Sequence, residues 1–176
     1  MKTKIICIVG PSGSGKTHMA NHLEEEYGIK MIESRTTRPP RHEGEKGHTF
    51  VSDAEFDSYK DEWMIAYTKF GDYRYCCLHT DVTGPVMSYV IDEYGLKYLC
   101  EHFGDIYHIF SVRVFVDYEK RRLLVGEERV LRDEGKFTMG EDEFDFFIDN
   151  SSFGDYSHNI AKMLIRMYQK FDSQNP

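Results

Sequence analysis

Residues 10–17 read Gly10-Pro11-Ser12-Gly13-Ser14-Gly15-Lys16-Thr17. They fit the phosphate-binding loop G-x-x-x-x-G-K-[ST] at every fixed position. In such a loop the glycines let consecutive backbone N–H groups turn towards a phosphate, and the following helix presents the positive end of its dipole. We therefore predict a nucleotide-phosphate site here, with Lys16 reaching the β- and γ-phosphates and Thr17 holding Mg²⁺.

The segments on either side of the loop support this prediction. Residues 4–9 form an unbroken apolar, β-branched run, which is typical of a central parallel strand covered on both faces. Apolar residues then recur at helical spacing from Met19 to Tyr27, and Gly28 follows as a C-cap. A buried strand, a glycine-rich loop and a helix therefore follow one another in the order that a phosphate site requires.

Length and composition indicate one compact domain. The chain has 176 residues, of which 40% are hydrophobic and 30% charged, and no apolar stretch is long enough to span a bilayer. Its four cysteines show neither metal-ligand spacing nor a secreted disulfide framework, so we expect reduced thiols and a cytoplasmic location. The net charge of −8 argues against a protein that binds along the backbone of a long nucleic acid, because such proteins carry a basic surface.

A basic segment follows at residues 33–41. It is stiffened by Pro39 and Pro40, which favour extended or polyproline II conformations. With a period of three, Arg35, Arg38 and Arg41 can lie along one side and bind a phosphate. A solvated basic loop remains the alternative interpretation, because charged side chains are usually exposed.

The loop at 10–17, followed by Ser34-Arg35-Thr36-Thr37-Arg38-Pro39-Pro40-Arg41, resembles the guanylate kinase family, which carries S-x-T-T-R-x-P-R after its phosphate loop. Looser matches to family motifs extend over nearly the whole chain, at residues 44–52, 53–56, 71–75, 90–95 and 147–150. This resemblance implies an α/β, three-layer P-loop kinase fold with a parallel central sheet, a small mixed α/β acceptor-binding insertion and a short lid.

The same resemblance divides the single domain, 1–176, into three parts. It implies a core of residues 1–33 and 79–176, an acceptor-binding lobe at about 34–78 and a lid at about 121–137. Local patterns agree with the lobe. Ser52 and Glu55 form a capping box that predicts a helix from Asp53 to about Lys60. Aromatic and β-branched residues at 63–70 and 73–78 predict a hairpin. We expect this insertion to act as a hinged flap.

Two further strands are predicted in the central part of the chain. The first includes Tyr89-Val90-Ile91, and Asp92 follows it at the edge where ligands of open α/β sheets bind. By resemblance Asp92 lies near Mg²⁺ or the acceptor. A carboxylate that merely starts the helix predicted at 94–103 is the alternative. The second strand runs over 106–116, and residues 30–32 are expected to add a short strand.

The lid region is rich in arginine. Asp117 is a reasonable N-cap for a helix that ends at about Val125, and Arg122 and Arg129 would share a helical face if Gly126 left the helix unbroken. By resemblance, Arg129 is the arginine expected to meet the transferring phosphoryl group. A surface helix with internal salt bridges remains the alternative.

The last elements are a core strand and a helix. Residues 144–148 read as the strand, and the resemblance places Asp149 and Asn150 near the adenine edge of the donor. An apolar stripe then recurs at helical spacing and is expected to pack in the core. Its members are Ile160, Met163, Leu164, Met167, Tyr168 and Phe171.

The resemblance implies transfer of the γ-phosphoryl group of ATP to a nucleoside or deoxynucleoside 5′-monophosphate similar to GMP or dGMP, with Mg²⁺ as cofactor. Such catalysis is mainly positioning and charge neutralisation. We expect Lys16, Arg129 and Asp92 to act in catalysis and the loop at 10–17 to bind the donor. The expected acceptor site consists of Ser34, Arg38, Arg41, His48, Ile65, Tyr73, Tyr75 and Asp92.

The sequence leaves the base of the acceptor open. Counting back from Gly71 places Ile65 where the resemblance calls for a guanine-reading carboxylate. Isoleucine packs but cannot accept a hydrogen bond, so Tyr67, Thr68 or His48 could read the base instead, and a pyrimidine, a deoxynucleotide or a modified base competes with guanine. Two other functions also stay open: a catalytically weak nucleotide-binding interaction module of the same shape, and a P-loop kinase for another phosphorylated small molecule. Neither a long nucleic acid nor a membrane is expected as a partner.

Overall fold

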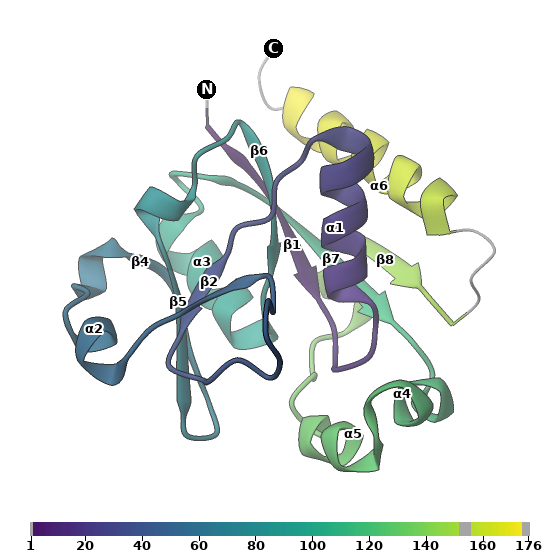
Figure 1. Cartoon of the computed structure of the whole chain (residues 1–176). Coiled ribbons are helices and arrows are strands. Elements are labelled where there is room, and N and C mark those ends of the chain that lie inside the picture. Colours follow the sequence, from purple (N-terminus) through teal and green to yellow (C-terminus); the bar gives the residue numbers. More distant parts are fainter. Residues whose placement is uncertain (1, 152–155, 174–176) are drawn as a thin grey trace.

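Two four-stranded sheets organise the chain (Figure 1). In this computed structural model, residues 2–151 and 156–173 are described. The central sheet has the order β6-β1-β7-β8 and is parallel throughout, as predicted. Its strands are β6 (Val86–Val90), β1 (Lys4–Val9), β7 (His108–Phe115) and β8 (Phe146–Asp149).

Helices cover both faces of this sheet and complete a three-layer α/β fold, which confirms the predicted fold class (Figure 1). Successive residues of β1 point to opposite faces. Ile6 and Ile8 therefore pack with α1 (Lys16–Tyr27) and α6 (Tyr156–Asp172), whereas Ile5 and Cys7 pack with α3 (Glu93–Phe103). Among the described residues, no helix is long and apolar enough to span a bilayer.

The second sheet has the order β3-β2-β5-β4 and lies beside the first, where Figure 1 draws it in blue. The predicted hairpin is confirmed as β4 (Met64–Phe70) and β5 (Tyr73–Leu78). Strand β2 (Ser34–Thr36) pairs antiparallel with β5 and parallel with β3 (His48–Phe50). The short helix α2 (Asp53–Asp57) and the 3-10 helix η1 (Asp61–Trp63) lie between β3 and β4, and the 3-10 helix η2 (His79–Asp81) leads from β5 to β6 of the central sheet.

Two local predictions in this region were wrong in extent. Helix α2 starts at its predicted cap, because the Ser52 side chain accepts from the Glu55 amide, but it ends at Asp57 instead of Lys60. The backbone is already extended at Lys60, where η1 begins. The strand expected at 30–32 is only an isolated bridge between Met31 and Ser88, because the chain leaves the edge of β6 after one residue.

The helices of the expected lid form two separate elements, α4 (Tyr118–Val125) and α5 (Glu127–Asp133). Asp117 caps α4 as predicted by accepting from the Lys120 amide. Gly126 has φ 84° and ψ 153°, which breaks the helix. The condition for Arg122 and Arg129 to share one helical face is therefore not met, and Arg122 pairs instead with Glu119 of its own helix.

The remaining elements follow the predicted order with shifted boundaries. Strand β7 is shorter than the run at 106–116. Strand β8 begins two residues later than predicted, after the 3-10 helix η3 (Glu141–Glu143). On α6, the predicted stripe is buried except at Tyr168, which is 42% exposed and lies under the ammonium group of Lys4. The Tyr168 ring therefore lies at the edge of the buried face of α6.

Candidate functional site

The phosphate loop connects β1 to α1 at the carboxyl edge of the central sheet (Figure 1). Gly13 and Gly15 adopt φ +80° and +94°, a conformation that other residues rarely adopt. A Cβ at Gly15 would lie 2.6 Å from Asn150 Nδ2, which donates to the Ser14 carbonyl oxygen at 3.1 Å. The sequence placed Asn150 near adenine; the structure shows that it supports the loop from behind.

Lys16 begins α1, and its Nζ donates to the Pro11 carbonyl oxygen at 2.9 Å. Burial lowers the pKa of Lys16 to about 8, although the nearby Asp133 carboxylate acts in the opposite direction. The guanidinium groups of Arg121 and Arg129 lower this pKa further. Thr17 is exposed in the first turn of α1. The loop thus holds a partly desolvated cation that an anionic ligand would stabilise.

Helices α4 and α5 contact the loop at Ser12. The Ser12 amide donates to Asp133 Oδ2 at 2.7 Å, and Arg132 Nη2 donates to the Ser12 hydroxyl at 3.1 Å. Burial would raise the pKa of Asp133, but hydrogen bonds from Ser12 and the pairing with Arg132 hold it below its usual value. Asp133 is therefore a negatively charged group in contact with the phosphate loop. No local sequence signal distinguishes it from the neighbouring Glu134.

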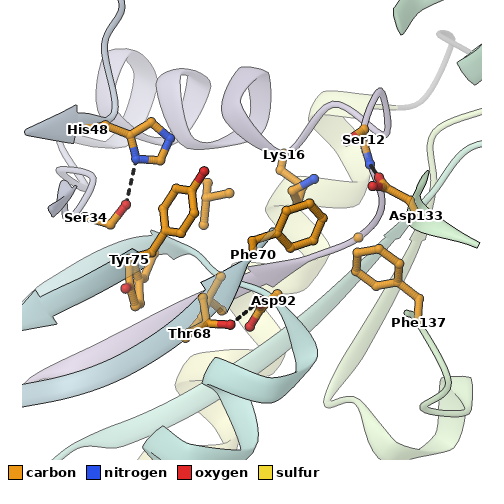
Figure 2. A pocket seen from close by; sticks show the side chains of 14 residues that line it. Ser12, Lys16, Ser34, His48, Thr68, Phe70, Tyr75, Asp92, Asp133 and Phe137 are labelled. Carbon is orange, nitrogen blue, oxygen red and sulfur yellow. Dashed lines mark hydrogen bonds between the residues drawn. The ribbon is translucent and has the colours of Figure 1, made fainter. Parts of the chain in front are cut away.

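A single cavity lies between this loop and the second sheet (Figure 2). Its walls bring together side chains from both sheets, from α1 and from the segment after α4. The polar and aromatic residues that line it include Ser12, Lys16, Ser34, His48, Thr68, Phe70, Tyr75, Asp92, Asp133 and Phe137. Seven residues expected in the site thus line one cavity, namely Gly10, Ser12, Lys16, Ser34, His48, Tyr75 and Asp92.

One wall of the cavity carries Ser34 and His48, from β2 and β3. Ser34 Oγ lies 2.7 Å from His48 Nδ1, and the His48 ring meets the Tyr75 ring edge to face at 5.9 Å between centroids (Figure 2). Burial lowers the pKa of His48, and the guanidinium group of Arg38 lowers it further. The imidazole is therefore neutral at physiological pH, with one ring nitrogen available as a donor and the other as an acceptor.

The opposite wall carries Thr68 and Asp92. Thr68 Oγ1 donates to Asp92 Oδ2 at 2.9 Å, and Asp92 Oδ1 accepts from the Gly95 amide at 2.7 Å (Figure 2). Asp92 therefore caps α3, which confirms the helix-start interpretation, and it also lines the cavity, while its role towards Mg²⁺ or the acceptor stays a prediction. The sequence offered Thr68, beside Tyr67 and His48, as a residue that could read the base, and the structure places Thr68 in the cavity. Its spacing of two from Phe70 on β4 puts both side chains on one face.

The arginines of the basic segment separate into two groups. Arg38 and Arg41 meet at Glu45, which accepts from Arg38 Nη2 at 2.8 Å and Arg41 Nη1 at 3.4 Å. The Arg38 hydrogen bonds lower the pKa of Glu45 to about 2. Arg35 instead pairs with Asp81. The expectation of three arginines on one side was wrong, because residues 34–36 form a strand rather than polyproline II.

Two expected acceptor residues do not face the cavity. Ile65 is 0% exposed and packs in the core beside Ile5 and Leu99, so it has no access to a bound base. Tyr73 is 40% exposed at the end of the hairpin and does not line the cavity. The offset from Gly71 does not say which face of β4 Ile65 occupies, and the alternation that puts Thr68 and Phe70 on the cavity face puts Ile65, next to an irregularity of the strand, on the other face.

The charge of Arg129, on α5, acts on two other cationic side chains. It lowers the pKa of Lys16 and also that of Arg41. Among the residues that the structure describes, no group of three or more His, Cys, Asp or Glu side chains is arranged to hold a metal ion. Mg²⁺ commonly keeps several waters and binds substrate phosphates, so the oxygens of Thr17 and Asp92 suit it as supplementary ligands.

Comparisons with known proteins agree on one family. A family model described as guanylate kinase matches residues 2–84. The guanylate kinase of Mycoplasmopsis pulmonis is 32% identical over 128 residues, which span 66% of this chain and 64% of that protein. The guanylate kinase of Helicobacter pylori is 26% identical and covers 96% of this chain and 91% of its own length. That of Bdellovibrio bacteriovorus is also 26% identical, over 93% of this chain and its own full length.

A solved structure shows the same fold. The crystal structure of guanylate kinase from Anaplasma phagocytophilum superposes with a TM-score of 0.67 at 21% sequence identity. The superposition covers 93% of this chain and 85% of that chain. The similarity therefore extends through both sheets of the molecule and is not confined to the phosphate loop.

Proposed function

The chain belongs to the guanylate kinase family of ATP-dependent nucleoside monophosphate kinases, and on that premise we propose that it transfers the γ-phosphoryl group of ATP to GMP or dGMP. The products are ADP and the corresponding nucleoside diphosphate. The donor binds at residues 10–17, and the acceptor binds in the cavity between the loop and the second sheet.

One observation carries the choice of guanine, namely the hydrogen bond from Thr68 to Asp92. Because the Thr68 hydroxyl donates to a carboxylate, its oxygen faces the cavity as an acceptor, and Asp92 offers further lone pairs beside it. Guanine presents two adjacent donors, N1–H and the 2-amino group. Adenine and cytosine each alternate a donor with an acceptor, and uracil and thymine carry one N–H between two carbonyl groups. Only guanine matches two neighbouring acceptors, although Ile65 supplies none.

The acceptor phosphate is assigned to Arg38, Arg41 and Tyr75. Among the described residues, Arg38 Nε is a buried donor without a hydrogen-bond partner, although its two terminal nitrogens are held by Glu45 and Pro39. Guanidinium groups recognise phosphate through paired N–H donors, so this arrangement supports phosphate binding. Tyr75 lines the same cavity. We do not retain Tyr73 or Ile65 in the proposed site.

On the donor side, the loop amides and Lys16 bind the polyphosphate. Mg²⁺, with Thr17 as a protein ligand, supplies charge neutralisation between the phosphates when it is bound. Arg129 is assigned to the transferring group, because its charge acts on both Lys16 and Arg41. The acceptor is already an anionic phosphate, so no side chain has to remove a proton. Catalysis then consists of alignment and electrostatic stabilisation.

The test is ADP release from ATP and Mg²⁺ against a panel of ribo- and deoxynucleoside monophosphates, with Lys16→Ala as the inactive control. We expect GMP and dGMP to give the highest kcat/KM. A preference for another base would refute the guanine assignment. If no nucleoside monophosphate of the panel led to ADP release, a binding module or a kinase for another phosphorylated acceptor would be favoured. Such substrates, together with four unbridged thiols, support a cytoplasmic location as part of this proposal.

A further inference from the structure

Every polar group of Ser12 is held by α4 or α5. Its amide donates to Asp133 at 2.7 Å, its carbonyl oxygen accepts from Arg121 Nε at 3.0 Å, and its hydroxyl accepts from Arg132 at 3.1 Å. Ser12 belongs to the phosphate loop, and Asp133 is 121 positions away in the chain. This end of the loop is thus fully engaged by the protein itself.

The Asp133 side chain is buried against the loop at 10–17. It is 3% exposed, whereas Leu131 and Glu134 on the same segment are exposed. It lines the cavity beside Lys16, and Lys16 donates to its own loop at Pro11. Figure 2 shows the carboxylate directed at the Ser12 nitrogen. A carboxylate that accepts from a loop amide makes the same kind of contact as a phosphate oxygen.

We propose that Asp133 is an internal occupant of the donor-phosphate site, which ATP displaces when it binds. This inference rests on the proposed function, because it takes residues 10–17 as the donor loop. Two anions cannot use one amide, and a carboxylate next to a polyphosphate is repelled by it. Binding of ATP therefore breaks the contact between Asp133 and Ser12. Until then, the contact holds α5 against the loop.

Displacement of Asp133 has a consequence across the cavity. Arg132 stands over the Phe70 ring at 4.8 Å from the centroid, and Lys136 stands over the same ring at 3.8 Å. Phe70 ends β4, in the sheet assigned to the acceptor. Movement of Asp133 also moves its neighbour Arg132, so donor binding changes the contact with Phe70. The two substrate sites are linked through these side chains.

The experiment is calorimetric titration of the full chain with ATP, without acceptor, for the wild type and Asp133→Asn. The substitution removes the charge but keeps an oxygen that can accept from Ser12. The matched control is Glu134→Gln, which makes the same charge change at the exposed neighbouring position. We expect Asp133→Asn to lower the Kd for ATP by about tenfold and Glu134→Gln by less than about twofold. The ratio of the Kd of the wild type to that of Asp133→Asn should be the same for tripolyphosphate as for ATP, because Asp133 competes with phosphate oxygens.

The outcomes separate this inference from the proposed function. If wild type and Asp133→Asn bind ATP with equal Kd, or the variant binds more weakly, the carboxylate does not compete and the inference is wrong. If neither protein binds ATP, both the inference and the proposed function are wrong. Thermal unfolding of each variant, together with Asp133→Ala as a second substitution that removes the carboxylate, guards against misreading a folding defect as an effect on affinity.

Discussion

Replacing Lys16 by methionine should abolish turnover and also make the folded protein more stable. The ammonium group of Lys16 is largely enclosed, and among the described residues it makes no ion pair. Within the described part of the chain, its hydrogen-bond partner is the Pro11 carbonyl oxygen. A buried charge without a partner lowers stability, and methionine has a similar length with no charge. The proposed function assigns the donor phosphates to the same ammonium group, which is why turnover should be lost.

The size and pH dependence of this effect follow from the pKa. Burial lowers the pKa of Lys16 from 10.5 to about 8, so folding disfavours the charged form. The penalty is complete below pH 8 and fades as the pH rises towards 10.5, where the unfolded chain also loses the proton. The full pKa shift corresponds to a loss of about 3 kcal/mol in the free energy of unfolding at pH 7 and of about 1 kcal/mol at pH 9.5. Because Lys16 keeps some solvent access through the cavity, we expect Lys16→Met to raise the free energy of unfolding by about 1 to 3 kcal/mol at pH 7.

Urea unfolding at pH 7 and pH 9.5 measures this effect directly. Lys16→Met should be more stable than the wild type at pH 7, and the difference should shrink at pH 9.5. Lys97→Met, which removes an exposed lysine from α3, is the control for the general effect of charge and hydrophobicity. If Lys16→Met is no more stable than the wild type at pH 7, or if its advantage does not depend on pH, the electrostatic reasoning is refuted.

Three further substitutions test other parts of the structure. Thr68→Val should lower kcat/KM for GMP by about three- to tenfold but leave IMP, which lacks the 2-amino donor, within about twofold. An equal loss for both substrates would count against base reading by Thr68. Glu93 accepts from Arg113 at 2.9 Å and from two backbone amides, so Glu93→Gln should lower the free energy of unfolding by about 2 to 4 kcal/mol in urea. A loss below about 1 kcal/mol would show that this network is not a stabilising one. Gly126→Ala should lower the free energy of unfolding by about 1 to 3 kcal/mol. The added Cβ would meet no atom within 4 Å, but the φ of +84° is strained for any residue other than glycine. Unchanged thermal unfolding would contradict this.

Features set by neighbours in sequence were predictable. The loop at 10–17 is a local motif, and the order of strand, loop and helix around it follows from apolar periodicity. The caps at Ser52 and Asp117 were also correct, because a cap depends on residues only three positions apart. The hairpin followed from two β-rich runs joined at Gly71-Asp72. In each case the decisive contact joins residues that are close to one another in the sequence.

Features set by distant partners were not predictable. Arg35 and Arg38 look alike in the sequence, and only the positions of Asp81 and Glu45 separate them. Ile65 was misplaced because an offset along the sequence does not fix which face of a strand a residue occupies. Thr68 pairs with Asp92, 24 positions away, and Asp133 with Ser12, 121 positions away, and a single sequence does not reveal such pairings.

The second sheet is joined to the first through shared apolar packing. Ile65, Ala66 and Cys77 from the hairpin belong to the same buried cluster as Ile5 and Cys7 of the central strand. Swinging this sheet outward as a rigid flap would expose these side chains to water, at about 1.5 to 3 kcal/mol for each large one. The expected hinged flap therefore has little freedom to swing on its acceptor side. Access for nucleotides then depends on α4 and α5, which hold the loop at Ser12 through three hydrogen bonds.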